Sequence, residues 1–203
     1  MTSLRHNAPT GTASARDDHL DAARACILDV GWRRTTLTEV ARRAGVSRMT
    51  IYRTWSDMAQ LLGDLMTREW GSVVARTTLA EDLASSRGLA AALVSVVRAL
   101  RHNELFVRIV ELDPELLLPY LFDRRGRSQQ ALVELVADAI TTGQATGRIR
   151  HGHPETMARS LVLAAHGFVL SAGTMVDGGV DGGVSLADLD GELRLLVECS
   201  LAP

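Results

Sequence analysis

The residues best suited to bind a charged partner lie between Arg33 and Arg53, where six arginines accompany a single acid, Glu39. A guanidinium is always charged, and its planar fork of N–H donors fits phosphate oxygens and the edge of guanine. The chain carries −2 overall, but nine arginines face five acids through Arg53 (+4), and thirteen face nineteen beyond it (−6). A basic N-terminal part on an acidic body favours local contact with nucleic acid over a merely solvated surface. All these cations are arginines, because the chain contains no lysine.

The segment TTLTEVARRAGVSRMTIYRTW, residues 35–55, predicts two short helices joined by a tight turn. Thr36 and Glu39 form a capping-box pattern, in which each side chain binds a free backbone N–H at the helix start. Gly45 can adopt the left-handed conformation that ends this helix, and Ser47 can cap the next one. The inner stripe of the first helix recurs at helical spacing and comprises Leu37, Val40, Ala41 and Ala44.

The second of these short helices has an inner and an outer face. Ile51 and Trp55 lie four residues apart and point inward. The residues left for the outer face are Arg48, Thr50, Tyr52 and Arg53. Two helices joined by a glycine-bearing turn form a helix-turn-helix, whose second helix enters the major groove of DNA by its N-terminal end.

Composition and periodicity predict an all-α protein. The chain of 203 residues is 46% hydrophobic and 23% charged, and its long runs rich in Ala, Leu and Val show no β-branched alternation. We expect a disordered tail at residues 1–13 and a three-helix helix-turn-helix domain at 14–62, whose first helix begins near Ser14 and ends at Gly31. A larger helical domain then occupies residues 63–203.

Several local signals place the helices of the larger domain. Ser56 or Asp57 can cap a fourth helix, Asp113 can cap a restart at Pro114, and Ser185 with Asp188 can cap the last helix. The last helix is expected to bury Leu189, Leu193, Leu196, Val197 and Leu201. The helix at residues 154–173 is apolar nearly all round at its centre, LVLAAHGFVLSA, so it should be buried on most sides, in the domain core or in an interface.

Other chemistries find little support in the sequence. Cys26 and Cys199 lack the spacing of a metal site and are expected to be reduced thiols. His151 and His153 form the closest histidine pair, but no acid or cysteine cluster accompanies them, so we expect no metal. No nucleophile–base pair or phosphate-cradling loop indicates an enzyme, and no cofactor is expected. The chain shows neither a signal peptide nor a membrane-spanning run, which predicts a cytoplasmic protein.

The N-terminal pattern resembles the TetR family of bacterial transcriptional regulators. The resemblance covers about residues 14–65 and is carried by Thr36, Val40, Ala41, the run Ala44-Gly45-Val46-Ser47, Thr50, Ile51, Tyr52, Trp55, Leu61 and Leu62. It implies a homodimer that binds double-stranded DNA at a palindromic operator, represses transcription and is released by a small-molecule effector. The larger domain would then bind the effector and form the dimer.

The resemblance also implies roles for individual residues. Thr50 corresponds to a base-contacting position and Tyr52 to a phosphate-binding tyrosine, while Arg48 would reach guanine or phosphate and Met49 would make apolar base contacts. Thr36 and Thr38 lie at a helix start that can hold phosphate, and Arg53 and Thr54 are further backbone contacts. Arg42 and Arg43 are equally well explained as solvated side chains. The family often has a lysine where this chain has Met58, so operator affinity should be modest.

The effector site and the dimer interface are the less specific predictions. The candidate pocket residues are Trp70, His102, Phe106, Phe122, His166 and Phe168, although an aromatic side chain on a helical stripe usually belongs to the core. The helix at residues 128–145 is expected to pair with one of the last two helices in a four-helix bundle across a two-fold axis. The alternatives are an effector-independent or activating DNA-binding regulator and a helical protein-interaction module.

Overall fold

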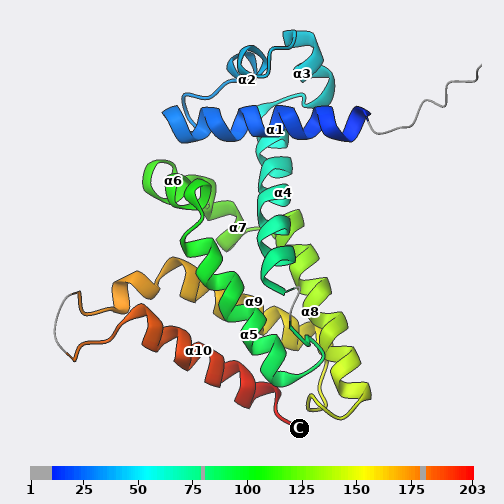
Figure 1. Ribbon diagram of the computed structural model, residues 1–203, viewed down its shortest axis with the longest axis vertical. Coiled ribbons are helices and arrows are strands. Elements are labelled where there is room, and N and C mark those ends of the chain that lie inside the picture. The colour runs from blue at the N-terminus through cyan, green and yellow to red at the C-terminus, as the bar shows by residue number, and fades with distance from the viewer. Residues whose placement is uncertain (1–10, 79–80, 179–181) are drawn as a thin grey trace, which may run out of the picture.

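The computed structural model describes residues 11–78, 81–178 and 182–203, and every regular element within them is helical (Figure 1). The predicted all-α fold class is confirmed. The α-helices are α1 (Gly11–Val30), α2 (Leu37–Arg43), α3 (Arg48–Thr54), α4 (Met58–Thr78), α5 (Ser86–Arg101), α6 (Glu104–Leu112), α7 (Leu118–Phe122), α8 (Arg127–Ala145), α9 (Pro154–Leu170) and α10 (Leu186–Leu201). Two short 3₁₀ turns, η1 (Pro114–Leu116) and η2 (Ala172–Met175), complete the set.

The helices divide between a small end and a larger body, as Figure 1 shows. Helices α1, α2 and α3 form one end, and α4 runs from them into the body made by α5, α8, α9 and α10. One hydrophobic core joins α1–α4 with Leu105 and Ile109 of α6. A second core joins α5, α8, α9 and α10. The boundary that we expect at residue 62 therefore falls inside α4, and α6 packs on the N-terminal core.

The local start and stop signals account for most helix ends. Gly31 ends α1 with φ +82°, Asp57 Oδ1 accepts from the backbone N–H of Gln60 at 2.8 Å, and Ser185 caps α10 with Asp188. The start of α1 was predicted too late, because the helix begins at Gly11 rather than near Ser14. Residues 11–13 of the expected tail are thus helical, and the rest of that tail lies outside the described residues.

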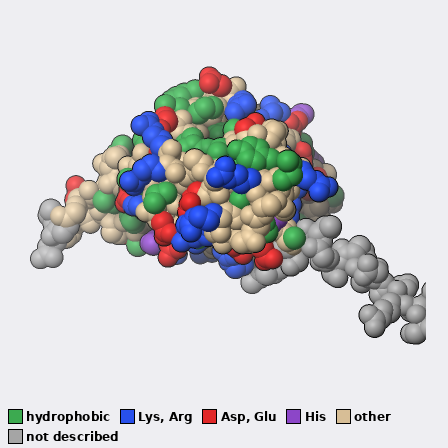
Figure 2. All heavy atoms as spheres, turned by 90° about the horizontal axis from the view of Figure 1, so that it is seen from above, with side chains coloured by type: hydrophobic (Ala, Val, Ile, Leu, Met, Phe, Trp, Pro, Cys, Tyr) green, Lys and Arg blue, Asp and Glu red, His purple; other side chains and the backbone are tan. Residues whose placement is uncertain are grey.

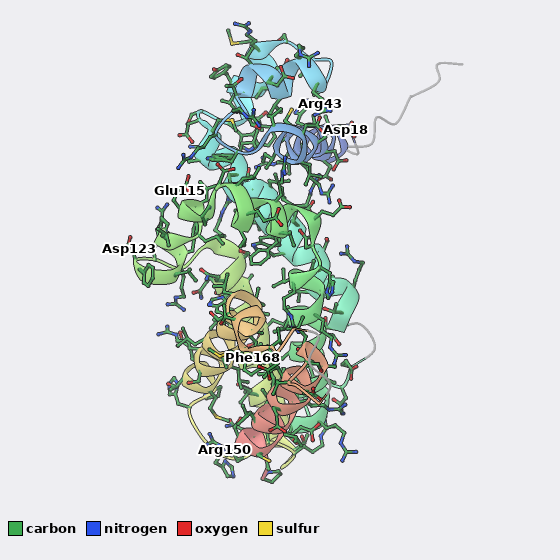
Figure 3. The ribbon with its side chains drawn as sticks, turned by 90° about the vertical axis from the view of Figure 1, so that its left-hand side faces the viewer. Asp18, Arg43, Glu115, Asp123, Arg150 and Phe168 are labelled. Atoms are coloured by element: carbon green, nitrogen blue, oxygen red, sulfur yellow. The ribbon has the colours of Figure 1, made fainter. Side chains whose placement is uncertain are left out.

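Asp113 does not cap the turn that follows it, which corrects the prediction from sequence. Its buried carboxylate instead reaches the end of α1, where Oδ2 accepts from the backbone N–H of Trp32 at 2.8 Å. Oδ1 lies 3.7 Å from Arg33 Nε, and Arg33 NH2 lies 2.6 Å from Glu115 Oε1. The free N–H after α1 needs a buried acceptor, and Asp113 supplies it. The corner around Glu115 is thereby held against the helix-turn-helix end (Figure 3).

Within the single chain helix α9 is buried on one side only, so it is not the centre of the domain core, and burial of its other side in an interface stays a prediction. Ala158, Leu161 and Val162 pack inside the body, whereas Leu163 is 69% exposed. The stripe predicted for α10 is met only in part, because Leu193, Val197 and Leu201 are buried but Leu196 is 60% exposed. A single chain offers these helices packing partners on one side, so their remaining apolar side chains face outward.

An ion cluster around the buried carboxylate of Asp190 ties α10 to α5. The carboxylate of Asp190 accepts from Arg98 Nε at 2.6 Å and also binds the guanidinium of Arg101. Asp190 and the Arg101 side chain are both buried, so each provides the other with the partner that a buried charge needs. Within the described residues, no helix is both long and apolar enough to cross a membrane.

Candidate nucleic-acid interface

Helix α2 begins with half of the predicted capping box. Thr36 Oγ1 accepts from the backbone N–H of Glu39 at 3.2 Å, as expected. The Glu39 carboxylate does not return to the helix start but accepts from Arg42 Nε at 3.0 Å and Arg42 NH2 at 2.6 Å. The hydrogen bond from Arg42 lowers the pKa of Glu39. The guanidinium one turn along the helix offers the carboxylate two donors and an opposite charge, whereas the return bond would offer it a single uncharged N–H, which explains the difference.

The turn and the start of α3 match the sequence pattern. Gly45 has φ +68°, the left-handed conformation that glycine adopts without steric cost. Ser47 Oγ accepts from the backbone N–H of Thr50 at 3.2 Å and lies 2.9 Å from Thr50 Oγ1. Ile51 and Trp55 are fully buried, with 0% and 1% exposure, so the inner face of α3 was correctly predicted. The opposite face of α3 must therefore point away from the core.

The outer face of α3 is open to solvent at the tip of the molecule. Met49 is 69% exposed and Tyr52 is 50% exposed, and Arg48, Thr50 and Arg53 are also exposed. Figure 2 views this end from above and shows arginine side chains around and between apolar ones. The structure thus brings five of the eight proposed DNA contacts onto one helix surface.

The other three proposed DNA contacts have side chains that are half-buried or already hydrogen-bonded within the protein. Thr36 is exposed, but its hydroxyl already caps α2. Thr38 is half-buried near the same helix start. Thr54 is half-buried as well, and its hydroxyl donates to the Thr50 carbonyl at 3.4 Å, within its own helix. The hydroxyls of Thr36 and Thr54 are therefore already engaged within the protein.

Most of the arginines counted from the sequence are bound within the protein. Arg33 pairs with Asp113 and Glu115, Arg34 Nε donates to the Val30 carbonyl at 2.8 Å, Arg42 binds Glu39, and Arg43 binds Asp29. Arg48 and Arg53 form no ion pair with any residue that the structure describes. Both lie on α3. The cationic part of the surface is consequently narrower than the composition of the segment suggests.

Met58 is the first residue of α4, where the sequence placed it. It is half-buried and packs against the N-terminal core. Asp57 beside it uses its carboxylate to cap α4. This helix start therefore presents no cationic side chain to a phosphate.

The predicted pocket residues do not converge on one site. Trp70 and Phe106 pack edge to face with ring centres 5.7 Å apart, whereas Phe168 packs in the second core (Figure 3). His102 is exposed, with Nδ1 2.8 Å from the Arg98 carbonyl oxygen. Phe122 is 79% exposed on α7, apart from the other candidates, and its place in an effector pocket stays a prediction without support from this fold. Phe122 is the last residue of this five-residue helix, and an arginine-rich segment follows it.

His166 occupies a polar position between α8 and α9. Its Nε2 lies 3.3 Å from Gln129 Nε2, which also donates to the Tyr120 carbonyl at 3.3 Å. Burial lowers the pKa of His166. An amide nitrogen can only donate, so His166 Nε2 accepts and the imidazole is neutral in this arrangement.

Two hollows lie elsewhere in the structure. An apolar cavity of about 20 Å³ lies among α4, α5 and α8 and is lined by Thr78, Leu83, Leu89, Ala92, Leu93, Val96, Leu132, Leu135 and Val136. A shallow surface hollow of about 500 Å³ lies beside α6 and includes Leu28 and His102. None of the aromatic residues proposed from the sequence lines the first cavity, because its lining is almost entirely aliphatic.

Comparison with known proteins agrees with this arrangement. Residues 20–65 match the family described as bacterial regulatory proteins, tetR family. An uncharacterised HTH-type transcriptional regulator of Mycobacterium bovis is 35% identical over 153 residues, which cover 75% of this chain and 79% of that protein.

Solved structures share the fold over nearly the whole chain. The repressor QsdR of Rhodococcus erythropolis has a TM-score of 0.67 at 15% identity, covering 95% of this chain and 98% of that one. FadR of Bacillus subtilis, solved in complex with stearoyl-CoA, has a TM-score of 0.63 at 17% identity, covering 91% and 98%.

The chain belongs to the TetR family of transcriptional regulators. It is a DNA-binding regulator with a helix-turn-helix, and its family is not one of enzymes.

Replacing the free arginine at the start of α3 should weaken DNA binding far more than replacing a paired one. We expect Arg48→Ala to lower the affinity for a specific site roughly tenfold or more and to reduce the salt dependence. Arg42→Ala, the matched control, removes a guanidinium held by Glu39 and should change affinity by less than about twofold. Fluorescence anisotropy titrations at several salt concentrations would measure both. Equal losses in the two variants would contradict this assignment.

A lysine at the start of α4 should strengthen DNA binding. In Met58→Lys the aliphatic stem can keep much of the methionine packing while the ammonium reaches the surface. We expect the affinity for DNA at fixed low salt to rise by about three- to tenfold. The slope of log affinity against log salt concentration should become steeper by the equivalent of about one phosphate contact. Met58→Gln controls for the loss of methionine. A lysine variant that binds no more tightly than the native protein would refute this expectation.

Proposed function

We propose that this protein is a repressor that binds a palindromic operator as a homodimer and is released by a small-molecule effector. The observation that carries the proposal is the exposed outer face of α3, with Arg48, Thr50 and Tyr52 on it and Ile51 and Trp55 buried behind it. Arg48, Met49 and Thr50 would read base edges in the major groove, and Tyr52 and Arg53 would bind phosphates. Thr36, Thr38 and Thr54 would assist at the backbone.

The proposed dimer interface is formed by α9 and α10. Exposed apolar side chains gather on these helices: Leu163 at 69%, Leu195 at 53% and Leu196 at 60%. Helix α8 buries Val133, Val136 and Ile140 inside its own chain, and Leu135, at 38%, is its largest exposed apolar residue. We therefore replace the expected pairing of residues 128–145 with a bundle of α9 and α10 from two chains.

The proposed effector is a largely apolar small molecule. The cavity among α4, α5 and α8 is lined by aliphatic side chains, and the solved FadR structure contains stearoyl-CoA. An effector that enlarges this cavity would move α4, which continues to the helix-turn-helix end. Release follows if the effector binds the non-operator conformation more tightly than the operator-bound one. In this proposal residues 14–62 bind DNA, residues 63–203 respond to the effector, and the protein acts in the cytoplasm.

The operator test uses a DNA fragment from upstream of the protein's own gene. We expect a footprint with two-fold symmetry and half-sites about 10 base pairs apart, and affinity that falls steeply with salt. Deleting the gene should raise expression of a reporter placed behind that fragment. A fall in reporter expression would instead indicate an activator, and the absence of any specific footprint would refute the proposal.

Charged substitutions should separate the two possible interfaces. Leu196→Glu places a carboxylate on each copy of a self-complementary surface, so we expect the dimer to dissociate at micromolar concentration. Ala131→Glu, on the exposed side of α8, should leave the dimer intact. Sedimentation equilibrium would measure both variants. Dissociation of the α8 variant alone would restore the interface expected from the sequence.

A further inference from the structure

Asp64 on α4 binds side chains from three separate parts of the chain. Its Oδ2 accepts from Trp55 Nε1 at 2.6 Å and also binds Arg16 of α1. Its Oδ1 binds the guanidinium of Arg127, the first residue of α8. The carboxylate side chain is only 12% exposed. Burial raises the pKa of Asp64, but the hydrogen bonds from Trp55 and Arg127 outweigh it and lower the pKa overall, so the carboxylate stays ionised.

The bond to Trp55 connects Asp64 with the end of the DNA-reading helix. Trp55 follows α3 directly, and its backbone N–H donates to the Ile51 carbonyl at 2.9 Å. Its indole ring is enclosed, with His19 edge-on at 6.1 Å and the Arg16 guanidinium 5.3 Å from the ring centre. The indole is a donor only, so Asp64 is the acceptor that sets its orientation. The position of this carboxylate therefore sets how α3 meets α4.

The bond to Arg127 connects the same carboxylate with the body. Arg127 lies close against α4, since a Cβ built on Gly63 would come within 3.3 Å of its NH2. Further along α8, Leu132, Leu135 and Val136 line the apolar cavity. A helix of 19 residues thus touches the cavity on one side and Asp64 at its first residue. A displacement of α8 at the cavity would shift the guanidinium at Asp64.

The three partners differ in how firmly they are held. Trp55 is 1% exposed, whereas the side chains of Arg16 and Arg127 are 49% and 66% exposed. Water competes with an exposed ion pair, so it contributes little energy and is readily exchanged. The hydrogen bond from the Trp55 indole to Asp64 is shielded from water and persists. The exposed bond from Arg127 to Asp64 is the one that a modest movement can break.

We propose that Asp64 is the positioning residue for α3, and that Arg127 is the contact through which α8 alters that position. This inference rests on the proposed function, since it assigns the path from the effector domain to the DNA-reading helix. When the Arg127 guanidinium moves away, Asp64 retains its hydrogen bonds to Trp55 and Arg16. The attraction to Arg16 of α1 is then no longer balanced by Arg127, so the carboxylate shifts and the end of α3 shifts with it. The two arrangements differ in their contacts, as a regulatory shift requires.

Hydrogen–deuterium exchange on the free full-length protein tests the proposal without DNA or effector. In Arg127→Gln we expect the backbone amides of α3 to exchange about three- to tenfold faster, while the thermal midpoint stays within about a degree. Arg127→Lys, which keeps the charge, should restore slow exchange. Arg148→Gln is the matched control, because it removes an exposed ion pair with Asp82 beyond the other end of α8.

Asp64→Asn provides the second half of a double-mutant cycle. We expect Asp64→Asn to speed α3 exchange at least as much as Arg127→Gln, and adding Arg127→Gln to it should produce no further increase. If α3 exchange is unchanged in Arg127→Gln, or rises equally in Arg148→Gln, the proposal is overturned. Its failure is distinguishable from failure of the proposed function, which would appear as a missing operator footprint with this exchange pattern intact.

Discussion

The burial of Ile51 and Trp55 is the constraint on which the DNA-reading surface depends. Helix α3 has seven residues, too few to be stable alone in water, so its shape and orientation come from packing. Two side chains four residues apart anchor it, and the indole adds a hydrogen bond to Asp64. Because packing of the inner face fixes the position of α3, Met49 and Tyr52 on the outer face can remain exposed. The exposed outer face of α3 is therefore a consequence of the burial of its inner face.

Arginine serves two purposes in this chain, and the structure separates them. Arg33 and Arg127 join parts of the protein that are far apart in sequence, binding Glu115 and Asp64 respectively. Arg48 and Arg53 form no ion pair within the described residues and point outward on α3. Alongside the apolar packing of α6 on the N-terminal core, partly exposed ion pairs thus join the helix-turn-helix end to the rest of the chain. Such ion pairs are weak individually and can change partners, which fits the proposed release from DNA by an effector.

The accuracy of sequence reasoning follows the distance over which each interaction acts. Ser47, Asp57 and Ser185 were correctly predicted as caps because their partners lie three residues away. Asp113 followed the same local pattern, but its carboxylate binds Trp32, 81 positions earlier. Phe122 looked like a pocket residue because it is aromatic, yet its side chain is exposed in the fold. The DNA contacts proposed on α3 were accessible to sequence reasoning because helical periodicity assigns the two faces of a short helix.

The sequence by itself determined the helix-turn-helix and its outer face, because capping, glycine geometry and helical spacing all act within one or two turns of chain. Tertiary structure alone decided which arginines on the described chain have no ion pair, which helices expose apolar side chains, and that Asp64 joins α3 to α8. Each of these depends on residues separated by tens of positions meeting in space. The physical reason is that a charged or apolar side chain binds whatever the fold places beside it, and local patterns carry no information about that neighbour.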